Sequence, residues 1–454
     1  MDTMKIHDVI VVGAGLSGLA AAKMLEKNGL STIILEAQNR IGGRVHSVEV
    51  DGTIVDLGGQ WVGPTQDKLL GLIKEFGLEM HPQYNQGKSL IYVGGKRRTL
   101  KGIFPSMKMR ENVEFFTQIG LMELASTLSG DVDKAPQKWP YTALDSLTIQ
   151  DYADKTILQK NVRALFETAS QVILSADPSE VSFLYFLHYL KSGGGFQKLA
   201  DVKNAAQENR VVGGTQQIIE KMAEKLSADI RTDSPVKSVE YTDDKVIVTT
   251  EEETFLAKKL LLALSPTMIS KISFTPELPK SRQNLHQEMK MGSVLKSVFG
   301  FERPFWREQG VTGEAVITEG PIQTVFDNCN GGVDQMPQLV TFSTGKEAKK
   351  LGQLTQEQRK LVIQKELVRL YGEKASEYVF YVEKDWNKEP WINGCYVAIA
   401  GTETLTRFGG RLSQAHGPIH FAGTETAMKW RGYMDGALRS GEREAKKIAK
   451  AIKG

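Results

Sequence analysis

The sequence predicts an α/β fold made of more than one domain, and three observations lead to this prediction. An apolar strand, a glycine-rich loop and a helix follow one another within the first 30 residues. A strand followed by a helix returns in the middle of the chain and again near its C-terminus. At 454 residues the chain is also too long for a single hydrophobic core, so two or three domain-sized units are expected.

The first strand is expected at residues 9–12, an apolar run short enough to be a buried strand. Gly13, Gly15 and Gly18 follow in GxGxxG spacing, ahead of a helix rich in alanine and leucine that runs to Leu25. In this spacing the first glycine allows a tight turn and the second lets the backbone approach a pyrophosphate. The third lets the helix pack closely on the strand.

The residues after this helix support a dinucleotide-binding turn. Gly29 ends the helix as a left-handed cap would, and a second strand at residues 32–35 leads to Glu36. The Glu36 carboxylate can accept hydrogen bonds from ribose hydroxyls, while the helix N-terminus offers N–H groups to the phosphates. Strand, helix and acid at this distance make a purely structural glycine loop the weaker interpretation. The motif alone does not separate NAD from FAD.

Hydrophobic periodicity and turn residues predict the later elements. Helices are expected at residues 66–76, 216–226, 356–370 and 436–452, and residues 107–195 are expected to be mostly helical. Strands are expected at residues 236–241, 245–250, 254–256, 259–264, 295–301, 338–343 and 419–423. A hairpin is expected at residues 90–100, and the basic run at residues 96–98 should be its solvated arm rather than an anion site.

The composition excludes several functional classes. The 57 basic and 54 acidic residues leave a net charge of +3, which does not indicate a nucleic-acid-binding protein. No apolar run approaches the roughly 20 residues of a membrane helix, and no signal-peptide pattern precedes the first strand. The two cysteines form no disulfide framework, and the histidines lack metal-site spacing, so no metal is expected. We expect a cytoplasmic protein without a membrane anchor.

Two stretches after the second strand indicate the cofactor. Residues 36–44 (EAQNRIGGR) and 56–61 (DLGGQW) resemble the extended signature of FAD-dependent amine oxidases. In that family the second glycine pair and its arginine, here Arg44, close over the pyrophosphate, where a guanidinium can pair with two phosphate oxygens. The second stretch places backbone beside the isoalloxazine ring. The resemblance therefore implies FAD.

The C-terminal part carries the most specific resemblance, which is to the flavin monoamine oxidases. Its blocks are Trp386, 394–396 (GCY), 421–426 (FAGTET) and 430–437 (WRGYMDGA). Residues 207–214 and 291–296 resemble two further signatures of that family. The similarity runs in blocks over nearly the full length and is weakest from residue 107 to 191, the region expected to shape substrate access.

This resemblance implies a two-domain FAD-dependent amine oxidase fold, with a Rossmann-like FAD domain and a mixed α+β substrate domain. The FAD-binding domain is expected to be discontinuous, in segments 1–80, 206–290 and 386–454. The substrate domain is expected at residues 81–205, mostly helical, and at residues 291–385.

Three residues are implied to be catalytic. Tyr396 and Tyr433 match an aromatic cage whose two rings hold a neutral amine in front of the flavin. The alternative interpretation of these two tyrosines is ordinary core packing. Lys296 matches the lysine that holds a water against flavin N5, although its strand pattern leaves open which face the side chain takes.

The resemblance also implies residues that contact substrate and cofactor. Gln207, Tyr396 and Tyr433 match substrate-binding positions, and Phe342 and Thr324 fall at roughly corresponding places. The implied FAD contacts are Gly13, Gly15, Ser17, Gly18, Glu36, Arg44, Gly59, Gln60, Trp61, Val236, Trp386, Cys395, Thr424, Glu425 and Met434.

Cys395 leaves the mode of FAD attachment open. In mitochondrial monoamine oxidases the cysteine of a similar block forms a thioether to the flavin 8α-methyl group, whereas related enzymes hold FAD without a covalent bond. Cys329 has no matching role and is expected to be a small buried hydrophobe.

The implied activity is oxidation of a primary amine to an imine, which is hydrolysed to an aldehyde and ammonia while O2 is reduced to H2O2. A polyamine oxidase would need acidic residues along its entry channel, and an L-amino-acid oxidase would need an arginine for the substrate carboxylate. The sequence locates neither those acidic residues nor that arginine. The tyrosine pair favours monoamines as substrates. A flavin-binding interaction protein without turnover would have no need of Lys296 or the two tyrosines. The expected partners are a small amine and O2, with a homodimer as a further expectation.

Overall fold

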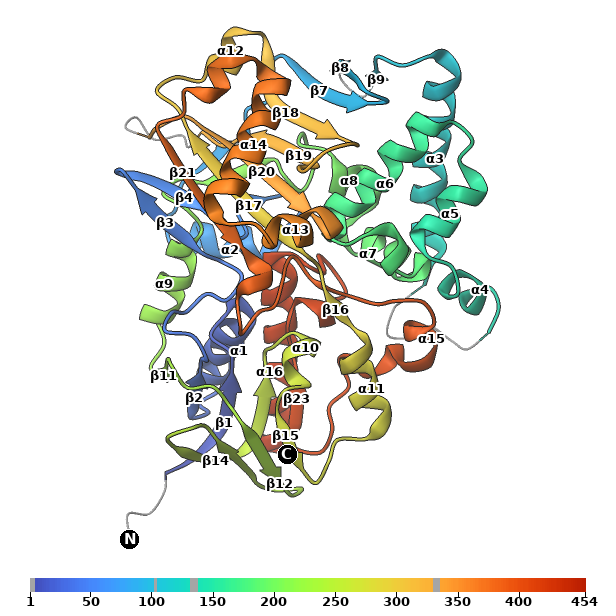
Figure 1. Ribbon diagram of the computed structural model, residues 1–454. Helices are drawn as coiled ribbons and strands as arrows, with labels where there is room; N and C mark the ends of the chain where they lie inside the picture. The colour runs from blue at the N-terminus through green and yellow to red at the C-terminus, as the bar shows by residue number, and fades with distance from the viewer. Residues whose placement is uncertain (1–4, 102–103, 131–137, 330–334) are drawn as a thin grey trace.

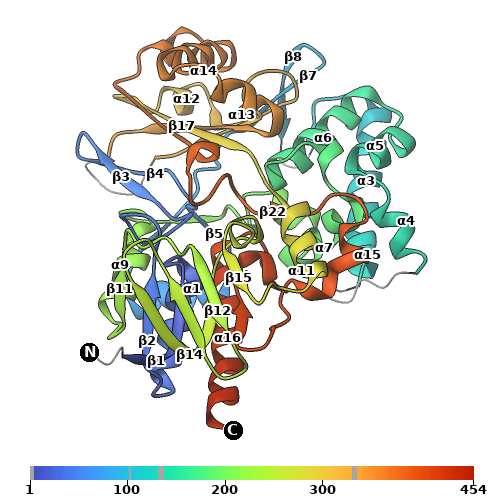
Figure 2. The same ribbon diagram turned by 60° about the horizontal axis from the view of Figure 1, so that its bottom comes forward.

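The computed structural model describes residues 5–101, 104–130, 138–329 and 335–454. Two large β-sheets form its two halves, one in the lower and one in the upper part of Figure 1. A block of helices lies beside the upper sheet. Figure 2 turns the lower sheet toward the viewer, with the C-terminal helix along it.

The lower sheet has eight strands in the order β11-β2-β1-β14-β13-β12-β15, with β23 also pairing with β14. Its strands are β1 (Ile6–Val12), β2 (Thr32–Leu35), β11 (Asp229–Arg231), β12 (Ser238–Tyr241), β13 (Val246–Thr249), β14 (Thr254–Leu262), β15 (Ser273–Thr275) and β23 (Ile419–Phe421). β1 pairs in parallel with β2 and β14, and β14 pairs in parallel with β23. The carboxyl ends of these strands therefore meet at one edge, where open α/β sheets bind ligands.

Helices α1 (Leu16–Lys27), α9 (Gln216–Glu224) and α16 (Met434–Lys453) pack against the lower sheet in one hydrophobic core. Close packing between α1 and α16 depends on Gly441. A Cβ at that position would lie 2.0 Å from the carbonyl oxygen of Ser17. Glycine therefore lets the backbones of the first and last helices meet.

One expectation for the lower sheet was wrong. Residues 254–256 and 259–264 were expected to be two strands, but one continuous strand, β14, covers most of both. It continues because β1 pairs alongside it from Leu256 to Leu262, and because Lys258 forms an ion pair with Asp8 at 2.7 Å. Pairing with a neighbouring strand outweighs the local polar signal.

The upper sheet has the order β21-β17-β20-β19-β18-β7-β8-β9. Its strands are β7 (Lys88–Val93), β8 (Lys96–Lys101), β9 (Phe104–Pro105), β17 (Val294–Gly300), β18 (Val311–Ile317), β19 (Thr324–Asp327), β20 (Gln338–Thr344) and β21 (Phe380–Asp385). Helices α12 (Phe305–Glu308), α13 (Gly345–Gly352) and α14 (Gln356–Tyr371) accompany it. The predicted hairpin and the strands and helix predicted between residues 295 and 370 are confirmed, with small shifts at their ends.

The helical block beside the upper sheet confirms the prediction for residues 107–195 where the structure describes them. Its helices are α3 (Met109–Leu128), α4 (Tyr141–Asp145), α5 (Ile149–Thr156), α6 (Lys160–Leu174), α7 (Phe183–Gly193) and α8 (Phe196–Ala200). They enclose a core that includes Phe166, Phe186 and Leu190. Within the described ranges, no helix is both long and apolar enough to cross a membrane.

Smaller elements connect these three parts. The short strands are β3 (Ser47–Val50), β4 (Thr53–Asp56), β5 (Trp61–Val62), β6 (Met80–Pro82), β10 (Asn209–Val211), β16 (Lys290–Met291) and β22 (Ala398–Ile399). The remaining α-helices in the described residues are α2 (Asp67–Glu75), α10 (Pro266–Ile269), α11 (Lys280–Glu288) and α15 (Thr404–Phe408). Strand β10 lies between β5 and β6, so it joins the middle of the chain to residues near its start.

Candidate active site

A cavity of about 570 Å³ extends from the glycine-rich turn of the lower sheet to the upper sheet. Gly13, Gly15 and Glu36 belong to its wall on the side of the lower sheet. Lys296 and Phe342 belong to its wall on the side of the upper sheet. The cavity therefore brings together the dinucleotide turn and the residues predicted to act on a substrate.

Every residue predicted to contact FAD or substrate lines this cavity, except Gly18 and Glu425. Gly18 lies behind the wall, where an added Cβ would come within 1.9 Å of the Gly13 carbonyl oxygen. This close approach is the packing role that its place in the motif predicted. Glu425 lies behind Arg44, which does line the cavity.

The turn between β1 and α1 fits the phosphates of a dinucleotide. Gly15 precedes the helix, and no side chain caps its first N–H groups in the described structure. Gly13 has a φ of +101°, a conformation that L side chains rarely adopt. The helix therefore presents free N–H groups and its positive dipole end to the cavity, as an anion site requires.

Glu36 directly follows β2 at the same edge of the sheet. Its carboxylate accepts hydrogen bonds from the backbone N–H groups of Ala14, at 2.8 Å, and Gln38, at 3.0 Å. Burial raises the pKa of Glu36, and these two hydrogen bonds oppose that rise. The carboxylate is thus held in the cavity wall at the position where the sequence placed a ribose partner.

Arg44 and Glu425 form a bidentate ion pair. Arg44 Nη1 donates to Glu425 Oε1 at 2.7 Å, and Nη2 donates to Oε2 at 3.2 Å. Nη1 also donates to the carbonyl oxygen of Tyr396 at 2.9 Å. Burial opposes the charge on Arg44, but Glu425 raises the arginine pKa above its ordinary value. Glu425, which lies behind the wall, therefore keeps Arg44 charged at the cavity wall beside Tyr396.

The Lys296 side chain lies on the strand face that lines the cavity. The sequence alone left open which of the two strand faces it would take. The side chain is 2% exposed, and Nζ donates to the carbonyl oxygen of Gly58 at 3.0 Å and to Gln60 Oε1. The ammonium also lies 5.5 Å from the ring centre of Phe342. Burial lowers the pKa of Lys296 to about 7, so the amine can gain or lose a proton near neutral pH.

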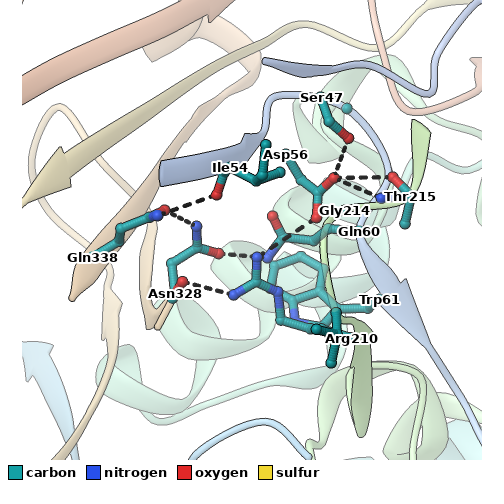
Figure 3. Close-up of polar contacts among 12 residues, drawn as sticks. Ser47, Ile54, Asp56, Gln60, Trp61, Arg210, Gly214, Thr215, Asn328 and Gln338 are labelled. Carbon is teal, nitrogen blue, oxygen red and sulfur yellow. Dashed lines mark hydrogen bonds and ion pairs between the residues drawn. The ribbon is translucent and has the colours of Figure 1, made fainter. Parts of the chain in front are cut away.

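A buried polar network holds the partner of Lys296 in place (Figure 3). Gln60 Nε2 donates to Asn328 Oδ1 at 2.9 Å, and Arg210 Nη1 donates to the Asn328 carbonyl oxygen at 2.8 Å. Arg210 also pairs with Asp56 at 3.6 Å, and both side chains are only 1% exposed. The network fixes the amide orientation of Gln60, whose oxygen then accepts from Lys296.

The two predicted cage tyrosines line the cavity within aromatic clusters. The ring of Tyr396 meets Phe342 edge to face at a centroid distance of 6.2 Å, and Tyr433 meets Trp430 in the same way at 5.1 Å. Burial raises the pKa of Tyr396 and of Tyr433, so both phenols stay neutral. Their neighbours fix the ring planes, which is the preorganisation that a cage requires.

Cys395 is buried beside Tyr396, and the peptide bond between them is cis. The Ser175 hydroxyl donates to the Cys395 carbonyl oxygen and accepts from the Tyr396 N–H at 2.7 Å. Burial raises the pKa of the Cys395 thiol to about 12. The second cysteine, Cys329, is half-buried instead of fully buried, because it lies at the margin of the upper core.

Sequence reasoning missed several cavity residues. They include Val172 and Ile173 of α6, Leu199 of α8, and Glu314 and Val316 of β18. The first three lie in or next to the region where the family resemblance was weakest. Alternation along residues 311–317 places Glu314 and Val316 on one strand face, but it does not reveal that this face lines a cavity. In the described part of the chain, no group of three histidine, cysteine or acidic side chains could hold a metal ion.

Comparison with known proteins gives consistent similarities. The sequence model described as flavin containing amine oxidoreductase matches residues 16–449. A probable flavin-containing monoamine oxidase A of Dictyostelium discoideum is 35% identical, over 98% of this chain and 97% of that protein. A flavin-containing amine oxidase of Danio rerio is 36% identical, over 99% of this chain and 87% of that protein.

Solved structures show the same relationship. Cyclohexylamine oxidase from Brevibacterium oxydans superposes with a TM-score of 0.95 at 30% identity, covering 99% of this chain and all of that one. Putrescine oxidase bound to putrescine gives 0.92 at 32% identity, covering 98% and 99%. With the family sequence match, the dinucleotide turn and the tyrosine-lined cavity in agreement, this chain belongs to the flavin-containing amine oxidoreductases.

Proposed function

We propose that this protein oxidises primary amines with FAD, releasing an imine that is hydrolysed to an aldehyde and ammonia while O2 is reduced to H2O2. The observation that carries this proposal is the shared cavity. A turn suited to a dinucleotide and a pair of half-buried tyrosines lie in one continuous wall with Lys296. An amine held by the tyrosines would therefore meet the flavin end of the cofactor.

FAD, when bound, supplies the acceptor for two electrons from the amine. The N-terminus of α1 with Gly13 and Gly15 would hold the pyrophosphate, and Glu36 would accept from the ribose. Arg44 would add its positive charge near the phosphates. Its terminal nitrogens already donate to Glu425, so this role acts through charge more than through a new bidentate pair.

Tyr396 and Tyr433 would hold the substrate nitrogen between their ring faces. Because both phenols are neutral and half-buried, the site favours the neutral amine over its cation. Only the neutral amine has the lone pair that C–H cleavage requires. Gln207 would orient the substrate. Its Nε2 donates to the Leu199 carbonyl oxygen at 3.1 Å, while its buried Oε1 has no hydrogen-bond partner in the described structure.

Lys296 would assist oxygen reduction and proton movement. As a cation it stabilises negative charge that develops on oxygen, and with a pKa of about 7 it can also release a proton at neutral pH. Gly58 and Gln60 hold its Nζ in place. The water that this family holds with the equivalent lysine would bind at the same nitrogen.

Cys395 would carry FAD through a thioether to the 8α-methyl group. The thiol lies in the cavity wall next to Tyr396, which supports this role.

We also propose that the chain divides into two domains. The FAD domain would comprise residues 1–80, 206–290 and 386–454, and the substrate domain would comprise the remainder. The two large sheets draw their strands from these two sets of segments. A cytoplasmic homodimer stays a prediction.

Two of the three alternative functions receive less support. An L-amino-acid oxidase would use an arginine for the carboxylate, but Arg44 is the sole arginine among the described cavity residues, and it is paired with Glu425. A non-catalytic flavin protein would leave the costly burial of Lys296 without a purpose.

The test is an aerobic assay of the purified yellow protein with benzylamine and with hexylamine. We expect one equivalent each of aldehyde, ammonia and H2O2 for every amine consumed. Amine consumption without peroxide, or no consumption of any primary amine by the FAD-loaded protein, would refute the proposal.

A further inference from the structure

Arg282 is a buried arginine that lies outside the amine cavity. It belongs to the first turn of α11, and its side chain is 3% exposed. Its Cζ lies 3.9 Å from the ring centre of Phe421, and Nη2 donates a hydrogen bond to the Gln414 carbonyl oxygen. Neither of these residues carries a charge. The two contacts therefore hold the guanidinium in place without neutralising it.

The other terminal nitrogen of this guanidinium, Nη1, is buried without a hydrogen-bond partner among the described residues. Burial lowers the pKa of Arg282 to about 10, and the charge of Arg411 lowers it further. With this pKa the side chain is still a cation at neutral pH. A buried donor on a charged group is costly when it stays unpaired, so this nitrogen is a candidate binding point for an anion.

The side chains around Arg282 are basic, and we call the four residues Arg282, His286, Arg411 and His416 the Arg282 cluster. Helix α11 lies beside α15, and Arg411 follows α15 in the chain (Figure 2). Burial and the charge of Arg282 lower the pKa of His286 to about 3 and also lower the pKa of His416. Both histidines are therefore mainly neutral at pH 7, and the charge of the cluster comes from its two arginines.

The N-terminus of α11 adds to the positive potential. In the described structure no side chain caps this helix, and its first turn contains no acidic residue. The N-terminus of a helix is the positive end of its dipole, which favours an anion and disfavours a cation. Arg282 therefore lies where both the helix and Arg411 oppose its charge.

The acidic residues at the two ends of α11 are engaged elsewhere. Glu288 pairs with Arg407 at 3.3 Å, and Glu277 accepts a hydrogen bond from Gln283 at 3.2 Å. Within the described ranges, no carboxylate raises the pKa of Arg282. The protein thus keeps a buried cation without a counter-charge of its own, and a bound anion would offset that cost.

We propose that the Arg282 cluster binds a small inorganic anion, with chloride as the simplest member of the class. Nη1 of Arg282 would donate to the anion, and the half-buried Arg411 would add positive charge from the side nearer the solvent. None of the four residues belongs to the described wall of the amine cavity. The inference therefore does not depend on the proposed function.

The test is thermal unfolding of the FAD-loaded protein while chloride replaces gluconate at constant ionic strength. Loading with FAD keeps free anions away from the turn between β1 and α1. An anion that binds the folded protein alone should raise Tm by about 1–2 °C for each tenfold increase in chloride above the dissociation constant. The same series with phosphate distinguishes an oxyanion from a halide, and a rise in Tm with either ion supports the site.

Arg282→Met should abolish the dependence of Tm on chloride. Because it removes an unpaired buried charge, it should also melt no lower than the wild-type protein in gluconate. Lys280→Met removes an exposed cation from the same turn of α11 and is the matched control, with the wild-type chloride dependence. Arg411→Met leaves the buried guanidinium in place and should weaken chloride binding by about threefold or more. It tests the inference if Arg282→Met folds poorly.

Crystals of the FAD-loaded protein soaked in bromide should show anomalous density beside Arg282 Nη1. Three results would overturn the inference. They are equal Tm values in chloride, phosphate and gluconate, a chloride dependence that persists in Arg282→Met, and bromide density that is absent from the Arg282 cluster. Each of these results leaves the proposed amine oxidation untouched, because that reaction is measured separately.

Discussion

Lys296 Nζ donates a hydrogen bond of 3.0 Å to the carbonyl oxygen of Gly58. The lysine lies on β17, which is paired on both sides in the upper sheet, and the glycine lies in the loop after β4, packed against the backbone of Arg44 and His46. This contact joins the substrate side of the cavity to its cofactor side. Under the proposed function, it would also place a titratable amine where O2 reacts with the reduced flavin.

Replacing Lys296 with methionine should slow reoxidation of the reduced flavin by O2 by at least about tenfold, while anaerobic reduction by amine changes little. The physical reason is the loss of a positive charge that stabilises negative charge developing on oxygen. Stopped-flow measurement of the two half-reactions separates these effects. Lys290→Met, at an exposed position on β16, is the matched control and should change neither rate.

The oxygen reaction of the wild-type protein should also depend on pH. Because the pKa of Lys296 is lowered to about 7, the charged form predominates below that pH, and the rate should fall as pH rises through about 7. The Lys296→Met variant should show no such step. A step of equal size in the variant would assign the titration to another group.

Tyr433→Phe should lower kcat/KM for a primary amine by less than about tenfold, because the ring face remains. Tyr433→Ala should lower it by more than about tenfold, because the ring is lost. Steady-state kinetics with benzylamine measures both. Tyr152→Phe removes a hydroxyl outside the cavity wall and serves as control. Equal losses in the Phe and Ala variants would contradict a cage made of ring faces.

Glu425→Gln should lower the free energy of unfolding by about 2 kcal/mol or more, because it leaves the Arg44 charge without its buried partner. Denaturant unfolding of the FAD-loaded protein measures the change. The matched control is Glu75→Gln, which breaks the exposed pair with Lys23 and should cost less than about 1 kcal/mol. Similar losses of unfolding free energy in the two variants would show that the buried pair stabilises the protein no more than the exposed pair does.

Acid denaturation should leave the yellow colour in the precipitated protein if Cys395 carries FAD, as we propose. Cys395→Ser should instead release the colour into the supernatant, because a hydroxyl cannot form the thioether. Absorbance of the two fractions measures the partition. Colour released from the wild-type protein would show that FAD is held without a covalent bond.

The dinucleotide turn could be predicted because each of its parts is local. Residues 32–35 form β2 with the predicted bounds, and Gly29 has a positive φ after α1, as a left-handed cap requires. Gly18 packs against the Gly13 carbonyl, the role that its spacing implied. Glycine spacing, an apolar run and a following acid need no knowledge of distant segments.

The substrate half of the site could be predicted only in part. Alternation along a strand shows which residues share a face, but not what covers that face, so the orientation of Lys296 and the place of Glu314 stayed open. The network of Asp56, Arg210 and Asn328 joins three separate segments. No local pattern signals a contact of that kind, because it forms only when the sheets come together.

The measurement that tests the central claim most directly is an anaerobic titration of the purified yellow protein with benzylamine, followed by flavin absorbance. The account predicts that the flavin is bleached in proportion to the amine added, and that admitting O2 restores the colour and yields H2O2. A flavin spectrum unchanged by benzylamine and hexylamine alike would contradict it.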